Sequence, residues 1–141
     1  MIVTFRGHRE FSQEAEVRKW LFSVIEELIQ SGEKEFWHGG YGAFDSMAAS
    51  VVWELKQKYP YIKSVLVLPY LNKKICITKY DETLYPDLEN VLPRYAISYR
   101  NRWMMEKADV VVAFVQHDWG GAAQTLKYAI RKQKRIIQYE F

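Results

Sequence analysis

The feature that most constrains this chain is a regular alternation of short apolar runs with helical patterns. Two of the runs, 64–68 (SVLVL) and 110–115 (VVVAFV), show no alternation of polar residues, which is typical of parallel strands covered on both faces. The segments between the runs space their apolar residues three and four positions apart, as amphipathic helices do. Right-handed crossovers then join such strands into a parallel sheet. We therefore predict an α/β fold, a doubly wound domain of about five mainly parallel strands flanked by helices.

The pattern places the predicted elements along the whole chain. Strands are expected at 2–6, 36–38, 64–68, 110–115 and 135–139, and helices from Ser12 to about Gly32, from Asp45 to before Pro60, over about 96–107 and over about 122–131. The pattern is lost at about 69–95, which we interpret as an irregular, tyrosine-rich insertion. Five of the ten tyrosines lie in or beside it: Tyr70, Tyr80, Tyr85, Tyr95 and Tyr99. Such a segment could fold over a ligand, or serve as a dimer contact or a satellite core.

Length and composition limit the class of protein. With 141 residues, 49% hydrophobic and 26% charged, we expect a single domain spanning 1–141. No apolar run reaches the roughly 18 residues of a membrane span, and the start of the chain lacks the pattern of a cleaved leader. Together with a single cysteine, Cys76, these observations predict a cytoplasmic protein with no membrane partner. The net charge of +3 is too small to argue for nucleic acid by itself.

The unusual residues follow the predicted strands. The motif RGHRE follows the first strand, HGGYGAFD closes the second, and QHDWGGAAQT follows the fourth. The three histidines, His8, His38 and His117, all lie at these strand ends. Because ligands of open α/β sheets bind outside the carboxyl ends of the strands, we expect one rim of the sheet to hold the binding site.

Two glycine-rich turns on this rim predict an anion site. The turn through Gly39, Gly40 and Gly42 enters a helix near Asp45, and Gly120-Gly121 precedes the helix that carries Thr125. Backbone N–H groups at a helix start, freed of side chains by glycine, favour a phosphate. Neither turn is a G-x-G-x-x-G or Walker motif, because the Lys-Ser/Thr pair is missing.

Arginines near the rim could clamp such an anion. Arg9 leaves the first strand end just after Gly7, which makes it the better candidate by position. Arg100 and Arg102 lie two positions apart in one helix, so at most one of them reaches the rim, and the sequence does not decide which.

These stretches together resemble the SLOG superfamily of Rossmann-like nucleotide-binding proteins, which includes YpsA-like proteins, the Lonely Guy phosphoribohydrolases and DprA. The matching stretches are FRGHRE, HGGYGAFDSMAA, YRNRWMMEKADVVVAF and WGGAAQTLKYA, and the chain looks closest to small YpsA-like proteins. The resemblance implies a Rossmann-like domain that binds a nucleotide or nucleotide-derived molecule, such as an NAD- or ADP-ribose-like ligand, without a required cofactor. It implies ligand or phosphate contacts at Gly7, His8, Arg9, Gly39, Gly40, Gly42, Asp45, Arg100, Asn101, Gly120, Gly121 and Thr125.

The chain departs from the phosphoribohydrolases at one position that matters for chemistry. Their P-G-G-x-G-T-x-x-E motif supplies a glutamate for cleavage of the glycosidic bond, and direct alignment places Lys127 there. A cation cannot stabilise an oxocarbenium-like centre as a carboxylate does. Whether the chain catalyses a reaction therefore stays open, and no catalytic residue is assigned.

Three functions remain as alternatives. Binding or sensing of a nucleotide-derived small molecule is favoured. A nucleotide-processing enzyme would use Glu10, Asp45 or Asp118 as a base, with His8 or His117 as general acid. Single-stranded DNA binding, suggested by the DprA-like Arg100-Asn101-Arg102, is the least favoured, and we expect no nucleic-acid partner.

Two further expectations concern a metal and the oligomeric state. The spacing of the three histidines matches no metal motif, so we expect no metal site. The resemblance leaves room for a homodimer.

Overall fold

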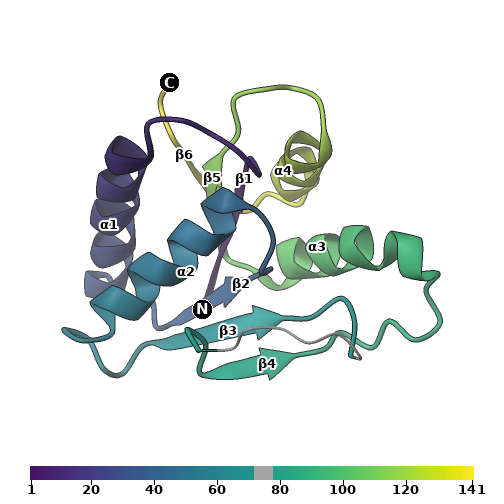
Figure 1. Cartoon of the computed structure of the whole chain (residues 1–141), viewed down its shortest axis with the longest axis horizontal. Coiled ribbons are helices and arrows are strands. Elements are labelled where there is room, and N and C mark those ends of the chain that lie inside the picture. Colours follow the sequence, from purple (N-terminus) through teal and green to yellow (C-terminus); the bar gives the residue numbers. More distant parts are fainter. Residues whose placement is uncertain (72–77) are drawn as a thin grey trace.

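The structure, a computed structural model, describes residues 1–71 and 78–141. Within these residues, a six-stranded parallel sheet forms the centre, with the strand order β4-β3-β2-β1-β5-β6 (Figure 1). The strands are β1 (Ile2–Gly7), β2 (Glu35–His38), β3 (Lys63–Val67), β4 (Glu82–Leu84), β5 (Val110–Phe114) and β6 (Arg135–Gln138). The predicted α/β, doubly wound fold is confirmed.

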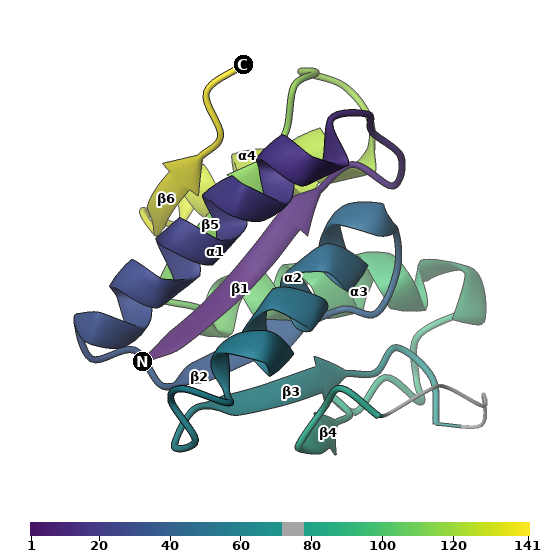
Figure 2. The same ribbon diagram turned by 60° about the vertical axis from the view of Figure 1, so that its left-hand side comes forward.

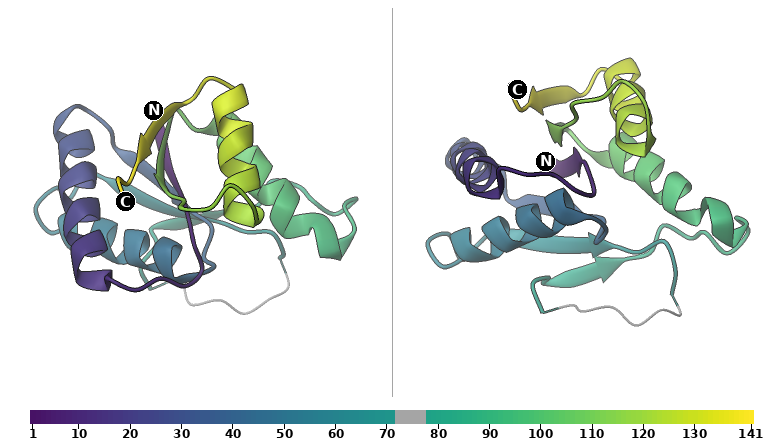
Figure 3. Two further views of the ribbon diagram at one scale, coloured as in Figure 1. Left: turned by 90° about the horizontal axis from the view of Figure 1, so that it is seen from above. Right: turned by 45° about the horizontal axis from the view of Figure 1, so that its top comes forward.

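Four helices cover the two faces of this sheet in the described part of the chain. They are α1 (Glu14–Gln30), α2 (Ala43–Leu55), α3 (Ala96–Lys107) and α4 (Gly121–Arg131), with a 3₁₀ turn, η1 (Pro93–Tyr95), ahead of α3. Helices α1 and α2 lie on one face and α3 and α4 on the other (Figure 3). Along β5, Val110 and Val112 pack in the core under α1 and α2, whereas Val111 packs with α3 and α4. Burial on both faces explains why this strand is apolar at every position.

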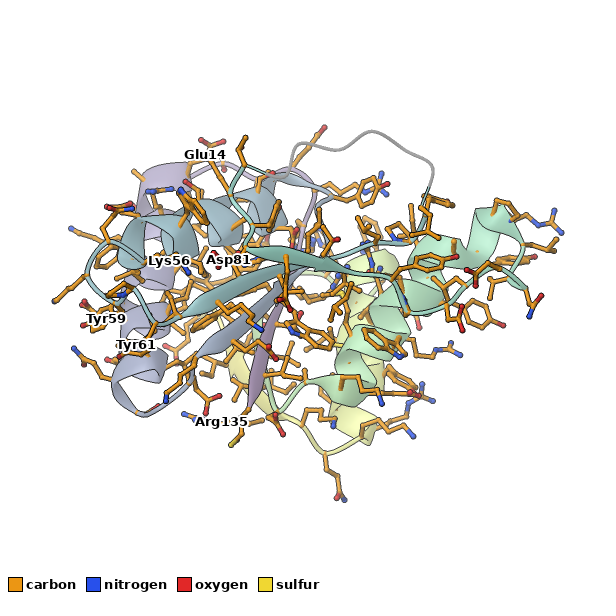
Figure 4. The ribbon with its side chains drawn as sticks, turned by 90° about the horizontal axis from the view of Figure 1, so that it is seen from below. Glu14, Lys56, Tyr59, Tyr61, Asp81 and Arg135 are labelled. Carbon is orange, nitrogen blue, oxygen red and sulfur yellow. The ribbon has the colours of Figure 1, made fainter. Side chains whose placement is uncertain are left out.

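Strand β4 is a correction to the predicted irregular segment. It pairs with β3 inside the region 69–95, of which residues 72–77 lie outside the described part. The strand is short, polar and at the edge, so it carries no apolar pattern. Asp81 anchors its start: the carboxylate accepts the Ser64 N–H at 2.7 Å and the Lys56 Nζ at 2.9 Å (Figure 4). Backbone pairing and this ion pair, rather than hydrophobic periodicity, position the strand.

Two predicted helix starts also differ from the structure. Helix α1 begins at Glu14, after Gln13, rather than under a Ser12 cap. Helix α2 begins at Ala43 with Gly42 before it, two residues ahead of Asp45. None of the described helices combines the length and apolar character needed to cross a membrane.

The strand order reverses between β1 and β5, where the sheet offers a crevice for a ligand. Figure 2 shows β1 in the centre, with α1 and α2 in front of the sheet and α3 and α4 behind it. The carboxyl ends of β1, β2 and β5 therefore face the same rim, where the three motifs of the sequence lie.

Candidate functional site

A pocket of about 670 Å³ opens at this rim. The ends of β1 and β2, the loop before α4 and the inner side of α3 form its walls. The predicted site residues that line it are Gly7, His8, Arg9, Gly39, Arg100, Asn101, Gly120, Gly121 and Thr125. His117, predicted as a candidate general acid, lines it too, whereas sequence reasoning missed Arg6, Tyr41, Arg94 and Trp119. We call this cavity the arginine pocket.

Two guanidinium groups meet in the arginine pocket. Arg100 reaches it from α3 and is 1% exposed, and its Nη1 donates to the carbonyl oxygens of Gly39 at 2.6 Å and Val67 at 2.7 Å. Arg6 reaches it from β1. The Asn101 Oδ1 accepts from Arg100 Nε at 2.9 Å and from Arg6 Nη2 at 3.2 Å, so one amide oxygen joins the two cations. The buried Arg6 Nε has no hydrogen-bond partner among the described residues.

The positive charge of the pair is not neutralised by an ion pair. Burial lowers the pKa of Arg100 to about 10, with a further contribution from the positive charge of Arg6, and burial also lowers the pKa of Arg6. Within residues 1–71 and 78–141, neither arginine forms a salt bridge. No Asp or Glu among these residues lines the pocket. A pocket with two cations and no carboxylate among its described lining residues can hold an anion.

The negative charge of Asp45 raises the pKa of both Arg6 and Arg100, but its carboxylate oxygens accept hydrogen bonds from the glycine turn. The carboxylate accepts the N–H of Gly39 at 3.2 Å and that of Gly40. The first N–H groups of α2 are also in use, because Ala43 donates to the carbonyl oxygen of Arg9 at 2.8 Å. The N–H groups of Gly39 and Gly40, two of the donors that a phosphate at Gly39, Gly40 and Gly42 would use, are therefore held by the chain's own carboxylate.

The glycines of this turn have another use in the structure. A Cβ at Gly39 would lie 3.2 Å from the Arg100 Cζ, so the absence of a side chain makes room for the buried guanidinium. Gly40 and Gly42 adopt positive φ angles of 81° and 89°, which only glycine adopts without strain. The turn shapes the arginine pocket from outside, and Gly40, Gly42 and Asp45 do not line it.

The second glycine turn is open to a ligand. Gly120 and Gly121 bring the start of α4 to the pocket wall, and the N–H groups of Gly121, Ala122 and Ala123 find no acceptor in the described part of the chain. The Thr125 hydroxyl donates to the Gly121 carbonyl oxygen at 3.0 Å. A helix start with free N–H groups beside two guanidiniums can hold a phosphate.

Exposed aromatic rings flank the pocket. His117 and Trp119 stack with ring centroids 4.5 Å apart and an interplanar angle of 13°, and Trp119 is 66% exposed. His8 lies against His117 at 5.0 Å, accepts the Gln116 N–H at its Nε2, and has a pKa lowered by burial and by His117. On the opposite side, the Arg100 Cζ lies 5.5 Å from the ring centroid of Tyr41. These rings offer stacking surfaces next to the anion site.

The candidate bases do not line the arginine pocket, although His8 and His117, the candidate general acids, do. Glu10 lines a neighbouring pocket, and Asp118 is exposed. Lys127, which stands where the phosphoribohydrolases have their glutamate, donates to the Asp118 carbonyl oxygen at 2.8 Å and so closes the loop before α4. The described residues contain no group of three or more His, Cys, Asp or Glu side chains that could hold a metal ion.

The structure decides between Arg100 and Arg102. Arg100 lines the pocket, whereas Arg102 is exposed and lies over the Tyr128 ring, 5.2 Å from its centroid.

The structure also bears on the idea that the tyrosine-rich segment covers the ligand. Tyr70 and Tyr85 line a separate pocket of about 330 Å³, and among the described residues Tyr41 is the tyrosine of the arginine pocket.

Comparison with solved structures finds similar folds in DNA processing protein A. DprA from Helicobacter pylori, described for its single-stranded DNA binding mode, matches 100% of this chain with a TM-score of 0.72 and 17% identity. DprA from Streptococcus pneumoniae matches 99% with a TM-score of 0.71 and 17% identity. The fold is Rossmann-like, of the DprA type. The chain spans 66% and 50% of the length of these two DprA chains.

Two further matches are a solved structure and a protein that is similar in sequence. The Moco carrier protein from Chlamydomonas reinhardtii matches 97% of the chain and 74% of its own length, with a TM-score of 0.59 and 16% identity. The uncharacterized SPbeta prophage-derived protein YoqJ of Bacillus subtilis (strain 168) is 27% identical over 77% of each chain. No family model matches the chain. The resemblance to the SLOG superfamily is supported at the level of the fold, and the YpsA-like subfamily stays a prediction.

The expectation of no nucleic-acid partner is contradicted by this comparison. DprA-type folds stand among the structural neighbours, and one of them is described for its binding of single-stranded DNA. The expectation relied on a net charge of +3. A total charge averages over the surface, whereas the structure gathers Arg6, Arg9, Arg94 and Arg100 around one pocket.

Some signals of the missed residues were present in the sequence. Arg6 is a cation at the end of a largely apolar predicted strand, a position that indicates the rim of the sheet. Trp119 is a large aromatic residue directly before two glycines. The pairing of Arg6 with Arg100, 94 positions later in the chain, has no such signal.

His38 differs from the other two histidines. As the last residue of β2, it is expected at the same rim. Its side chain is 0% exposed, however, and stacks on Phe5 with the ring centroids 5.1 Å apart, beneath the pocket rather than in it. Neither ring nitrogen has a hydrogen-bond partner among the described residues. Burial lowers the pKa of His38 to about 4.

This histidine makes stability depend on pH. Because the unfolded chain protonates His38 near its ordinary pKa of about 6.5, acid favours the unfolded state from there down to about pH 4. Stability is full above pH 6.5, and His38 should remove about 2 kcal/mol of unfolding free energy between pH 7 and pH 5. Urea denaturation of the wild type and of His38→Leu at both pH values measures this difference. An equal pH effect in the two proteins would contradict it, and His117→Gln, at an exposed histidine, is the control.

Proposed function

We propose that the rim site binds single-stranded DNA and holds a backbone phosphate in the arginine pocket. The observation that carries the proposal is the pair Arg6 and Arg100, two guanidiniums without a salt bridge in a pocket whose described lining contains no carboxylate. Such charges are costly to bury, and a bound anion would compensate them. A phosphate offers the oxygens that the planar donor fork of arginine matches.

The surroundings favour an unpaired strand over a duplex. Arg100 is 1% exposed at the bottom of a pocket, so a phosphate must enter rather than lie on a surface. The exposed rings of Trp119 and Tyr41 stand beside it, and bases can stack on such rings only when they are not paired. The fold likeness to DprA, described for single-stranded DNA binding in Helicobacter pylori, supports the same proposal.

The experiment is fluorescence anisotropy with a labelled oligonucleotide of about 20 residues, single-stranded and as a duplex, over a salt series. The single strand should bind more tightly, with log K falling against log salt by about 0.7 for each phosphate neutralised. Equal affinity for the duplex, or no binding of the single strand at about 50 mM salt, would overturn the proposal.

A second candidate is the binding of a free nucleotide or a nucleotide-derived small molecule. The depth of Arg100 beside the open start of α4 favours it, because a terminal phosphate reaches such a site more easily than a phosphodiester. Competition of the labelled oligonucleotide with mononucleotides, NAD and ADP-ribose discriminates the two. A small molecule that binds more tightly than the oligonucleotide would assign the site to it.

Removal of the exposed Trp119 ring should weaken DNA binding without loss of stability. Base stacking on an aromatic side chain contributes about 1–3 kcal/mol, so Trp119→Ala should lower the affinity at least about 5-fold. The ring is 66% exposed, and its loss should leave the urea midpoint unchanged. Tyr61→Ala, at an exposed ring just ahead of β3 and therefore at the opposite end of the parallel strands from the rim, is the matched control (Figure 4). Equal affinities of the two variants would argue against stacking at this site.

A further inference from the structure

A second pocket, of about 910 Å³, lies directly beside the arginine pocket. Its walls are the β1–α1 loop, the start of α1, the loop after β5 and the residues after β6. The two pockets share His8, Arg9, His117 and Trp119. The stacked rings of His117 and Trp119 therefore form a ridge between them, and a nucleotide on this ridge can reach into both.

The charges of the two pockets are opposite in kind. Arg6, Arg9, Arg94 and Arg100 line the arginine pocket, without a carboxylate among its described residues. The second pocket is lined by Glu10, Glu16 and Glu140, with Arg9 as its one described Lys or Arg. Carboxylates repel a phosphate, so the second pocket suits an uncharged group that offers hydrogen-bond donors.

Aromatic rings make the second pocket a suitable place for a planar group. Among the rings that line it, Trp119 is 66% and Phe141 58% exposed, whereas Phe114 is 3% exposed, with the rings of Phe11, Tyr139 and Phe141 each 4.9 Å from it. Aromatic faces stack any base, and carboxylate oxygens accept hydrogen bonds from exocyclic amino groups. The pocket therefore combines a stacking surface with acceptors.

We propose that the second pocket receives a nucleobase that carries an exocyclic amino group, while the adjacent phosphate occupies the arginine pocket. This inference rests on the proposed binding of single-stranded DNA. Cytosine presents an amino donor at N4, where thymine presents a carbonyl acceptor. Thymine would face the carboxylates with a second set of acceptors, so the site discriminates against it.

The test compares labelled oligo-dC with oligo-dT of about 12 nucleotides near neutral pH, since the two pyrimidines have nearly the same size. A good donor–acceptor pair is worth at least about 1 kcal/mol, so oligo-dC should bind about 5-fold more tightly or better. Equal affinities, or tighter binding of oligo-dT, would overturn this inference and leave the proposed function intact. Binding of neither oligomer would instead count against the proposed function.

The double variant E10Q/E16Q connects the preference to the carboxylates. Both side chains are exposed, so the fold should be retained, and the dC-to-dT affinity ratio should fall toward one. If the carboxylates only repelled DNA in general, both affinities would rise equally and the ratio would stay the same, which would contradict the inference. Glu27→Gln, at an exposed position far along α1, is the matched control and should leave the ratio unchanged.

Discussion

Replacing Arg100 with glutamine is expected to weaken single-stranded DNA binding by about 100-fold. A buried, hydrogen-bonded charge pair loses about 2–5 kcal/mol when one partner is removed, and a factor of 100 corresponds to about 2.7 kcal/mol. Arg100 is 1% exposed beside Arg6, with Asn101 between them, so no other side chain can replace its charge at that depth. Anisotropy titration measures the loss. A smaller salt slope should accompany it, because one phosphate contact is removed.

Two further variants distinguish a loss of DNA binding from a loss of folding. Arg100 also donates to the Gly39 and Val67 carbonyl oxygens, so its loss destabilises the turn. Arg6→Gln removes the other cation, whose side chain donates to Asn101 alone among the described residues, and should also weaken binding more than 10-fold. Arg135→Gln, at the exposed first residue of β6 (Figure 4), removes a charge at the opposite end of the parallel strands from the rim and should change affinity little. If all three variants bind equally, the arginine pocket is not the phosphate site.

Gly7→Ala is expected to lower the unfolding free energy by about 2–3 kcal/mol. A Cβ at this position would lie 2.4 Å from ring atoms of Phe44, which is 1% exposed and packs on Phe114 at 5.5 Å. The ring has no free space to move into, so the strain spreads through the core. Equilibrium denaturation in urea measures the change as a shift of the midpoint.

Gly121→Ala is the matched control for this substitution. A Cβ at Gly121 meets no heavy atom within 4 Å, and alanine keeps the N–H that faces the pocket. We expect its stability to equal or slightly exceed that of the wild type, because alanine has fewer unfolded conformations to lose. Equal stability of the two variants would show that the Phe44 ring moves to make room for the Cβ. A glycine at position 7 would then be required for ligand binding rather than for packing.

Much of the fold could be predicted because it depends on local patterns. The run at 110–115 is apolar throughout since two layers of helices cover it, and Val65 and Val67 of the run at 64–68 are buried in the core cluster that includes α3 and α4. Strand β4 escaped prediction because its position comes from pairing with β3 and from Asp81, which are contacts between distant segments.

The sequence predicted where the candidate site lies better than it predicted which of its groups are free to bind a ligand. The rim and most of its lining residues follow from the rule that strand ends carry the ligand. The first glycine turn was interpreted as a phosphate cradle, yet Asp45 accepts the N–H groups of Gly39 and Gly40, and the Arg9 carbonyl oxygen accepts that of Ala43. An N–H group is free to bind a ligand only if no acceptor of the chain holds it. Here the acceptor of the Ala43 N–H is the Arg9 carbonyl oxygen, which lies in a distant part of the sequence.

The sequence alone determined the α/β class, the rim on which the unusual residues gather and the lysine at position 127, where the resemblance to the phosphoribohydrolases implies a glutamate. These follow from periodicity, the order of elements and residue identity. Only the tertiary structure decided that Arg100 rather than Arg102 faces the site, that Arg6 joins it, and that a pocket with carboxylates lies beside one without them. Burial and electrostatic coupling depend on distances across the fold, and a linear spacing rule contains no such distances.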